Sequence, residues 1–222
     1  MTFLTDPLIF SLRVLRFSIR PLDVERSSFF PNLAHPGRVV YTGDMKKRKL
    51  PLSKVYTLIE PGPVVLVTTM DQGRPNVMTL AWHTMLDFEP PLLGMVLSEQ
   101  NHSFAVLRKT KACVINLPSV ALRKAVVGCG NTSGRDTDKF AAFGLTPRPA
   151  KQVAAPLIDE CFASLECVVT DTRMVRQYNL FVLEVVQAWI DPDCGQPKTL
   201  HHCGTGNFMV AGRRITLPSA MK

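Results

Sequence analysis

Short runs of apolar and β-branched residues, separated by turn-forming residues, follow one another along the chain from residue 51 onward. Residues 63–69 (PVVLVTT) and 76–82 (NVMTLAW) flank a tight turn at residues 71–73, where Gly73 can adopt a positive φ. Two such runs joined by a tight turn predict a β-hairpin. The same pattern predicts four further strands, at residues 91–97, 112–117, 162–169 and 180–190.

Three segments between these strands fit short helices, at residues 103–109, 120–127 and 137–143. Gly128 and Gly144 follow the second and third segments, and we expect them to end those helices because glycine readily adopts the left-handed conformation. Either Asp136 or Thr137 is expected to cap the third helix. Strands outnumber helices and the first two strands form a hairpin. The pattern therefore predicts a mainly β, antiparallel barrel with short connecting helices rather than a doubly wound sheet.

The first 44 residues follow no such pattern. Arg13 and Arg16 interrupt the apolar stretch at residues 8–19, and a signal peptide would need an uninterrupted apolar region. We expect residues 1–44 to be an N-terminal extension that is disordered, or that is not made because translation starts at Met45. A docked arm and a targeting segment are the alternatives. Residues 45–222 form the predicted domain.

Charge and hydropathy limit the classes of partner. The chain carries 26 Lys and Arg against 18 Asp and Glu, but residues 1–50 alone hold nine against four. The remainder has no dense basic stripe interleaved with aromatic residues, so we expect no nucleic-acid partner. A protein that binds nucleic acid through residues 1–44 stays as a rival hypothesis. No apolar run reaches the length of a membrane-spanning helix, so no membrane association is expected.

Six cysteines are present and none forms a CxxC pair. Small buried thiols in a reducing cytoplasm are the expected interpretation, and the predicted location is cytoplasmic. The residues His201, His202 and Cys203, with Cys194 nearby, match no standard zinc spacing, so no metal site is predicted.

Sequence motifs exclude several kinds of site. The chain has no GxGxxG after a strand, no Walker motif, no GxSxG and no HExxH, and its acidic residues form no evident catalytic pair. Two polar loops instead lead into predicted helices, at residues 98–103 (SEQNHS) and 133–140 (SGRDTDKF). Hydroxyls and backbone amides at a helix N-terminus can bind an anion, but spacing alone favours a capped turn over a phosphate site for each loop.

Several of these segments together resemble the flavin reductase-like, FMN-binding split-barrel family, and within it the flavoredoxin branch. The matching runs extend over residues 50–212: PVVLVTT (63–69), GRPNVMTLAW (73–82), PPL (90–92), NLP (116–118), SGRDTDKF (133–140), GLTP (144–147), PLI (156–158), LEC (165–167) and EVV (184–186). The runs PNVMT and SGRDTDKF in this order are the most specific. The resemblance implies an antiparallel, Greek-key split β-barrel and a homodimer with FMN near the dimer interface.

The resemblance also implies which residues hold the flavin. The strand at residues 76–82 would lie along the isoalloxazine ring, and the turn at 98–103 with the loop at 133–139 would approach the ribityl chain and phosphate. The implied contacts are Asn76, Met78, Thr79, Leu80, Ala81, Trp82, Ser98, Asn101, His102, Ser103, Ser133, Arg135 and Lys139. No protein residue is assigned a catalytic role, because the flavin itself carries the redox chemistry.

The implied activity is that of an FMN-binding oxidoreductase, with FAD as an alternative flavin. Hydride or electrons would pass from NADH, NADPH or a redox partner through FMN to a flavin, a protein acceptor or an oxygenase partner. Many flavin reductases of this superfamily carry a Gly-Asp-His motif whose His helps to hold the nicotinamide. Residues 177–185 (QYNLFVLEV) lack that His, and Leu183 replaces the usual glycine. This departure bears on the use of NADH or NADPH more than on FMN binding. A split barrel does not by itself establish an activity, so a non-enzymatic FMN storage or sensor protein is the alternative function.

Overall fold

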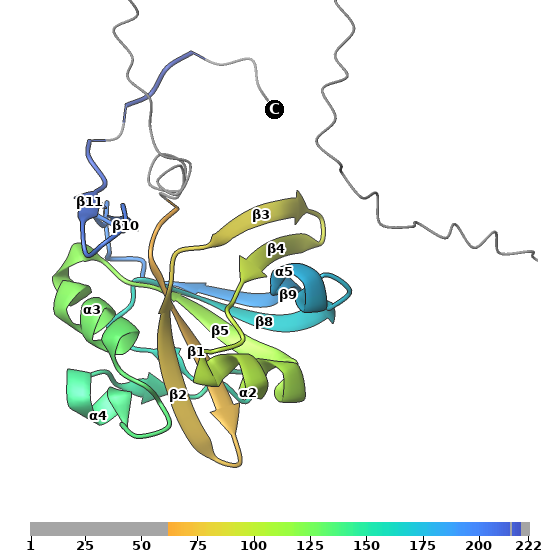
Figure 1. Ribbon diagram of the computed structural model, residues 1–222. Helices are drawn as coiled ribbons and strands as arrows, with labels where there is room; N and C mark the ends of the chain where they lie inside the picture. Colours follow the sequence, from red (N-terminus) through yellow and green to blue (C-terminus); the bar gives the residue numbers. More distant parts are fainter. Residues whose placement is uncertain (1–61, 214, 219–222) are drawn as a thin grey trace, which may run out of the picture. The chain divides into compact units, whose positions relative to one another are not determined.

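A seven-stranded, fully antiparallel sheet forms the centre of the part of the chain that the computed structural model describes, residues 62–213 and 215–218 (Figure 1). The strand order is β2-β1-β5-β8-β9-β4-β3. The strands are β1 (Val65–Asp71), β2 (Arg74–Leu80), β3 (His83–Phe88), β4 (Pro91–Val96), β5 (Ala112–Leu117), β8 (Ala163–Asp171) and β9 (Leu180–Ile190). The mainly β, antiparallel prediction is confirmed.

The hairpin of β1 and β2 forms as predicted. Asp71 pairs with Arg74, and the two residues between them, Gln72 and Gly73, have φ angles of 48° and 77°. Two consecutive positive φ angles produce a turn whose twist matches that of the flanking strands. Val65 and Val67 of β1 pack into one core cluster, whereas Leu66 packs into another. Burial of both faces explains why this strand is continuously apolar.

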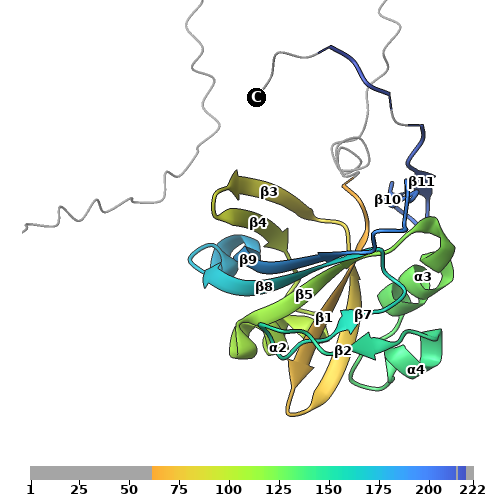
Figure 2. The same cartoon turned by 180° about the vertical axis from the view of Figure 1, so that it is seen from behind.

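Helices cover both sides of this hairpin (Figures 1 and 2). Helix α2 (His102–Thr110) links β4 to β5 and contributes Phe104 and Leu107 to the first core cluster. On the other side of the hairpin, α3 (Arg123–Asn131) and α4 (Lys139–Phe143) contribute to the second cluster. The shorter elements are η2 (Val120–Leu122), β6 (Pro147–Arg148), β7 (Leu157–Ile158), α5 (Val175–Tyr178), β10 (Leu200–His202) and β11 (Phe208–Val210).

The helix predicted at residues 120–127 differs from the one observed. The chain forms the turn η2 first, and α3 then continues through Gly128 to Asn131. Gly128 does not end the helix. A Cβ atom there would lie 2.3 Å from the ring of Phe143, so the absence of a side chain lets α3 and α4 pack closely. Gly144 does end α4 as predicted, with φ at +63°.

Two local predictions near β2 and α4 are corrected as well. The cap of α4 is Asp138, whose carboxylate accepts hydrogen bonds from the amides of Phe140 and Ala141, and it is neither Asp136 nor Thr137. Strand β2 ends at Leu80 instead of residue 82, and the unpredicted strand β3 begins at His83. The predicted extension at residues 1–44 lies outside the described residues, and so it stays a prediction.

All six cysteines carry free thiols, and four of them, Cys113, Cys129, Cys161 and Cys167, are buried. This agrees with the interpretation of the cysteines as small core residues. No helix among the described residues is long and apolar enough to cross a membrane.

Candidate functional site

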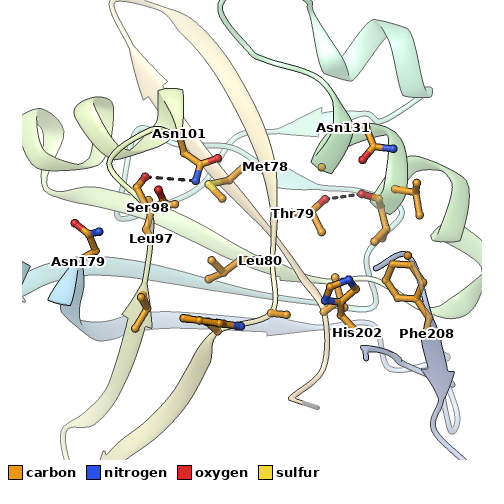
Figure 3. A pocket seen from close by; sticks show the side chains of 18 of the residues that line it. Met78, Thr79, Leu80, Leu97, Ser98, Asn101, Asn131, Asn179, His202 and Phe208 are labelled. Atoms are coloured by element: carbon orange, nitrogen blue, oxygen red, sulfur yellow. Dashed lines mark hydrogen bonds between the residues drawn. The ribbon is translucent and has the colours of Figure 1, made fainter. Parts of the chain in front are cut away.

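A cavity of about 610 Å³ opens where β2 ends, bordered by helix α3 and by the segment that follows β4 (Figure 3). A volume of this size is typical of cofactor and small-ligand sites. Seven predicted residues line it: Met78, Thr79, Leu80, Ala81, Trp82, Ser98 and Asn101. The structure thus brings the strand at β2 and the turn before α2 to one cavity, although they are separated in sequence.

Thr79 ties the strand side of this cavity to the helix side. Its hydroxyl donates a hydrogen bond to the carbonyl oxygen of Val126 in α3, at 2.6 Å (Figure 3). A Cβ atom at Gly130, one turn further along α3, would lie 3.5 Å from the Cβ of Thr79. Because Gly130 has no side chain, the space next to Thr79 stays open in this part of the cavity. With its proton committed to Val126, the Thr79 oxygen retains only the capacity to accept a hydrogen bond.

The turn before α2 leaves the N-terminus of that helix without a side-chain cap. The amide nitrogen of Asn101 donates to the carbonyl oxygen of Ser98 at 3.0 Å, and the Asn101 side chain contacts the same oxygen at 3.4 Å (Figure 3). The Asn101 side chain therefore does not cap the first amides of α2. Amides at a helix N-terminus that lack a side-chain acceptor, together with the helix dipole, favour a negatively charged ligand.

A smaller, polar cavity of about 190 Å³ adjoins the first and shares Met78, Asn101, Gly130 and Asn131 with it. Five other predicted residues line this second cavity: Asn76, His102, Ser103, Ser133 and Lys139. Together the two cavities contain twelve of the thirteen predicted residues.

Lys139 supplies a buried positive charge to the second cavity. Its side chain is 5% exposed, and its ammonium donates to the carbonyl oxygen of Cys129 at 2.8 Å. Burial lowers the pKa of Lys139, and the neighbouring Cys129 thiol partly opposes that shift. Lys139 takes part in none of the ion pairs among residues 62–213 and 215–218. A buried ammonium whose partner is a neutral carbonyl favours an anion, which would complete the charge pairing.

Asn76 brings to the same cavity a side-chain oxygen that has no hydrogen-bond donor. Its amide nitrogen donates to the hydroxyl of Ser103 at 2.8 Å, whereas its buried oxygen Oδ1 has no hydrogen-bond partner. The backbone of Gly134 packs so closely over this amide that a Cβ atom there would lie 2.0 Å from Oδ1. Asn76 and Lys139 line the same cavity, and an acceptor without a donor together with a buried ammonium fits a ligand that carries both hydroxyl and anionic groups.

Arg135 is the predicted residue that the structure does not bring to these two cavities. It lines a separate cavity of about 460 Å³, together with Arg74 and Thr69, which adjoins the second cavity at Asn76 and His102. The backbone of the loop at 133–137 turns back on itself, because the amides of Asp136 and Thr137 donate to the carbonyl of Ser133. Arg135 is exposed, and Gly134 before it lines both the second cavity and this one.

Several residues that line the first cavity were not predicted. Helix α3 contributes Val126, Val127, Gly130 and Asn131, and Tyr178 and Asn179 lie at another side. The four α3 positions follow helical spacing, so an amphipathic analysis of the helix could have found them. His202 and Phe208 come from the β10–β11 hairpin, and their rings lie 5.2 Å apart. No group of His, Cys, Asp or Glu among the described residues could hold a metal ion.

Comparison with known proteins places this geometry in a family. The model of the flavin reductase like domain matches residues 58–208, which include both cavities. The chain belongs to the flavin reductase-like family. The resemblance inferred from the sequence is therefore confirmed, and so is the split-barrel fold that it implied.

Two curated relatives match most of the domain of this chain. The protein YddH of Escherichia coli (strain K12) is 32% identical over 173 residues, which are 72% of this chain and 92% of YddH. The reductase component of 4-nitrophenol 4-monooxygenase/4-nitrocatechol 2-monooxygenase of Rhodococcus opacus is 28% identical over 151 residues, 66% of this chain and 74% of that component.

Two solved structures share the fold. An FMN-binding domain of a flavin reductases-like enzyme from Shewanella baltica OS155 superposes with a TM-score of 0.66 at 30% identity, covering 76% of this chain and 96% of that one. The flavoredoxin of Desulfovibrio vulgaris (Miyazaki F) superposes with a TM-score of 0.69 at 26% identity, covering 79% of this chain and 98% of that one.

Proposed function

We propose that the protein binds FMN and works as a flavin-dependent oxidoreductase of the flavin reductase or flavoredoxin type. The observation that carries the proposal is the pairing of an apolar cavity of about 610 Å³ with an adjoining polar cavity that contains a buried ammonium and the N-terminus of α2. FMN has the same division, with a flat aromatic ring at one end and a phosphate at the other. The Shewanella baltica relative is described as FMN-binding, which agrees with this interpretation.

The residues present fit this cofactor. Met78, Leu80 and the apolar residues of α3 would contact the ring, and Thr79 would accept a hydrogen bond at its polar edge. Asn76 Oδ1 would accept from a ribityl hydroxyl, and Lys139, Ser103 and the first amides of α2 would hold the phosphate. Bound FMN supplies hydride or electron transfer. The chain's own residues bind the cofactor, orient it and exclude water from one face of it.

The proposed electron donor and acceptor rest on one relative and on the residues that border the first cavity. We propose NADH or NADPH, or a redox protein, as the donor, and a free flavin or a protein as the acceptor. The Rhodococcus opacus relative is a reductase component of a monooxygenase, which supports an oxygenase partner for this chain. The segment that contains Tyr178 and Asn179 borders the cavity without supplying a histidine to it. That feature favours the second candidate, an FMN store or sensor that no nucleotide reduces.

A homodimer is proposed from the surface of β3. This strand is at one edge of the sheet, and its side chains Met85, Leu86 and Phe88 are exposed. An exposed apolar edge strand is a favourable surface for association with another copy of the chain.

The visible spectrum of the purified protein, recorded without oxygen while NADH and then NADPH are added, tests the proposal. A flavin absorption band that bleaches is expected for a nucleotide-dependent reductase. A band that persists would favour an electron carrier supplied by another protein, or the storage function. A protein that stays colourless after incubation with FMN would refute the assignment of the cofactor.

A further inference from the structure

Three positively charged side chains surround a further cavity of about 410 Å³ that lies between α2 and α5. Arg108 is in the last turn of α2, Lys111 follows that helix directly, and Arg176 is in α5. Glu99 is the acidic residue in the lining, so the positive charges exceed the negative ones by two. The remaining lining residues are Phe104, Thr172, Val175 and Asn179.

None of these three cations has a carboxylate partner among residues 62–213 and 215–218. Their basic neighbours in sequence do: Lys109 pairs with Asp71 at 2.7 Å and Arg173 pairs with Asp171 at 2.6 Å. No ion pair among the described residues therefore offsets the charges of Arg108, Lys111 and Arg176, and these charges can act on a ligand. The partial negative charge at the C-terminus of α2 amounts to about half an elementary charge, which three cations outweigh.

Packing and backbone contacts hold the guanidinium of Arg108 and the backbone at the other two cations. The guanidinium of Arg108 lies over the ring of Phe104, 5.9 Å from its centre, and Phe104 is buried in the barrel core. Lys111 is in the left-handed conformation with φ at 58°, and its amide donates to the carbonyl of Leu107. Helix α5 is anchored by the buried residue Val175. The contact with Phe104 reduces the entropy that the Arg108 side chain loses when a ligand binds.

This basic cavity borders the proposed flavin cavity. Asn179 lines both, and the preceding residue Tyr178 lines the flavin cavity while Arg176 lines the basic one. Ser98 lines the flavin cavity and the next residue, Glu99, lines the basic cavity. Figure 3 shows Asn179 and Ser98 on one side of the flavin cavity, away from Thr79 and His202. A ligand that extends past Asn179 would reach the cations with one end.

We propose that the basic cavity binds the phosphate of a redox co-substrate whose reactive ring enters the flavin cavity. The inference rests on the proposed function and adds a separate site for the phosphate of the co-substrate. Two arginines and a lysine around an open polar cavity suit a phosphate, which accepts several charge-assisted hydrogen bonds at once. Two co-substrates have this chemistry: a phosphorylated pyridine nucleotide as the donor, and a second, free FMN as the acceptor.

The test uses the FMN-loaded, full-length protein and the double variant Arg108→Gln/Arg176→Gln. Glutamine retains part of each aliphatic stem and removes the charge. The control is Arg123→Gln/Lys124→Gln, which removes two charges from α3 at positions that line none of these cavities. Calorimetry gives the Kd of NADP⁺ and of NAD⁺, and steady-state kinetics give the KM of free FMN and of riboflavin as acceptors.

If the donor's phosphate binds here, the Kd of NADP⁺ rises at least about tenfold in the double variant, more than that of NAD⁺. If the acceptor's phosphate binds here, the KM of free FMN rises by a similar factor and that of riboflavin does not. The control changes neither quantity. Unchanged values for all four compounds, or a wild-type protein that uses none of them, would overturn the inference. So would loss of tightly bound FMN from the double variant, whereas a colourless wild-type protein would instead refute the proposed function.

Discussion

Lys139 is the residue on which the proposed phosphate site depends most, and its burial makes a sharp prediction possible. Lys139→Met removes the charge and keeps an unbranched apolar chain of similar length. We expect the affinity for FMN to fall by about 10- to 100-fold, as for the loss of a charge-assisted hydrogen bond. The affinity for riboflavin, which lacks the phosphate, should stay within about twofold of wild type. Quenching of flavin fluorescence measures both.

The protein without flavin serves as the control for this variant. Since burial lowers the pKa of Lys139, the charged form is less favourable in the folded state, and its removal should leave the melting temperature of the apoprotein unchanged or raise it. Equal weakening of FMN and riboflavin would contradict the phosphate assignment. Lys139 would then act by holding the Cys129 carbonyl and the loop around it.

Glu166 is a buried carboxylate that lines none of the cavities described above. Burial by itself raises its pKa, but hydrogen bonds from the backbone amide of Lys151, the indole of Trp189 and the amides of Gln152 and Val153 reverse the effect. The pKa in the folded state is therefore below its usual value of 4.5. A carboxyl whose pKa is lowered by folding stabilises the protein above the unfolded-state pKa, and this contribution is lost as the pH falls through the folded-state pKa.

Glu166→Gln should accordingly reduce the free energy of unfolding by about 2 kcal/mol at neutral pH. The difference from wild type should shrink as the pH falls below 4.5, where the wild-type carboxyl also becomes protonated. Urea denaturation of both proteins at a series of pH values measures this. A difference that is constant with pH would indicate that shape, and not charge, makes Glu166 important. Flavin affinity should not change in this variant.

The residues of the candidate site could be predicted from the sequence where several of them belong to the same strand or short loop. Asn76 to Ala81 are consecutive in sequence, and the loops that begin at Ser98 and Ser133 each precede a helix. Arg135 shows where this reasoning fails. Its neighbours Ser133 and Lys139 line the second cavity, but the turn at Gly134 directs Arg135 to the next one. Sequence spacing does not encode the direction of a side chain in a loop.

At the level of elements, the sequence pattern predicts the buried strands and misses an exposed one. The strands β1, β4 and β5 are apolar because they lie in the core, and each was predicted. Strand β3 was not, since five of its six residues are exposed and its sequence HTMLDF has no core-facing alternation. It forms through pairing with β4, a tertiary effect. Gly128 was misinterpreted for a similar reason, because the contact that requires it comes from another helix.

Two glycines of α3 should respond differently to substitution, because Gly128 faces Phe143 of α4 whereas Gly130 faces Thr79 of β2. Gly128→Ala places a Cβ atom 2.3 Å from the Phe143 ring, so the helices must separate, at a cost of about 1–3 kcal/mol. Gly130→Ala places a Cβ atom 3.5 Å from Thr79, an ordinary contact, and the gain in helix propensity should leave stability unchanged or slightly higher. Thermal or urea denaturation of both variants compares them directly.

A second substitution checks the cause. Phe143→Leu shortens the side chain that meets the new methyl group, so it should recover part of the stability lost in Gly128→Ala. If Gly128→Ala is as stable as Gly130→Ala, the close approach of α3 to α4 is not what requires a glycine at residue 128.

At the level of the whole molecule, the family resemblance predicted the fold and most of the proposed site, whereas local patterns predicted the separate strands and helices. The cavity is formed by segments as distant as Met78, Val126 and His202, and only the folded sheet brings them together. Hydrophobic periodicity carries no information about such assembly, which is why α3 and the β10–β11 hairpin were absent from the predicted site. The predicted extension at residues 1–44 stays a prediction.

At the scale of the whole molecule, substitutions on the surface of β3 can test the proposed homodimer. Phe88 is 83% exposed on this edge strand, and Met85 and Leu86 beside it are about half exposed. A charge within an apolar interface must lose its hydration without gaining a partner, so Phe88→Asp should shift the protein from dimer to monomer. Ile190→Asp is a matched control, because Ile190 is also an exposed apolar residue, 71% accessible, but is in β9 rather than at the sheet edge.

Light scattering coupled to size-exclusion chromatography measures the mass of each variant. If FMN lies near the dimer interface, the monomeric Phe88→Asp variant should also bind FMN more weakly than wild type, although Phe88 lines none of the cavities described. A monomer that keeps full affinity would separate the two proposals, leaving the flavin site complete within one chain. A Phe88→Asp protein with unchanged mass would mean that β3 is not the dimer contact. The exposed apolar residues of β3 would then be available to a redox partner instead of a second copy.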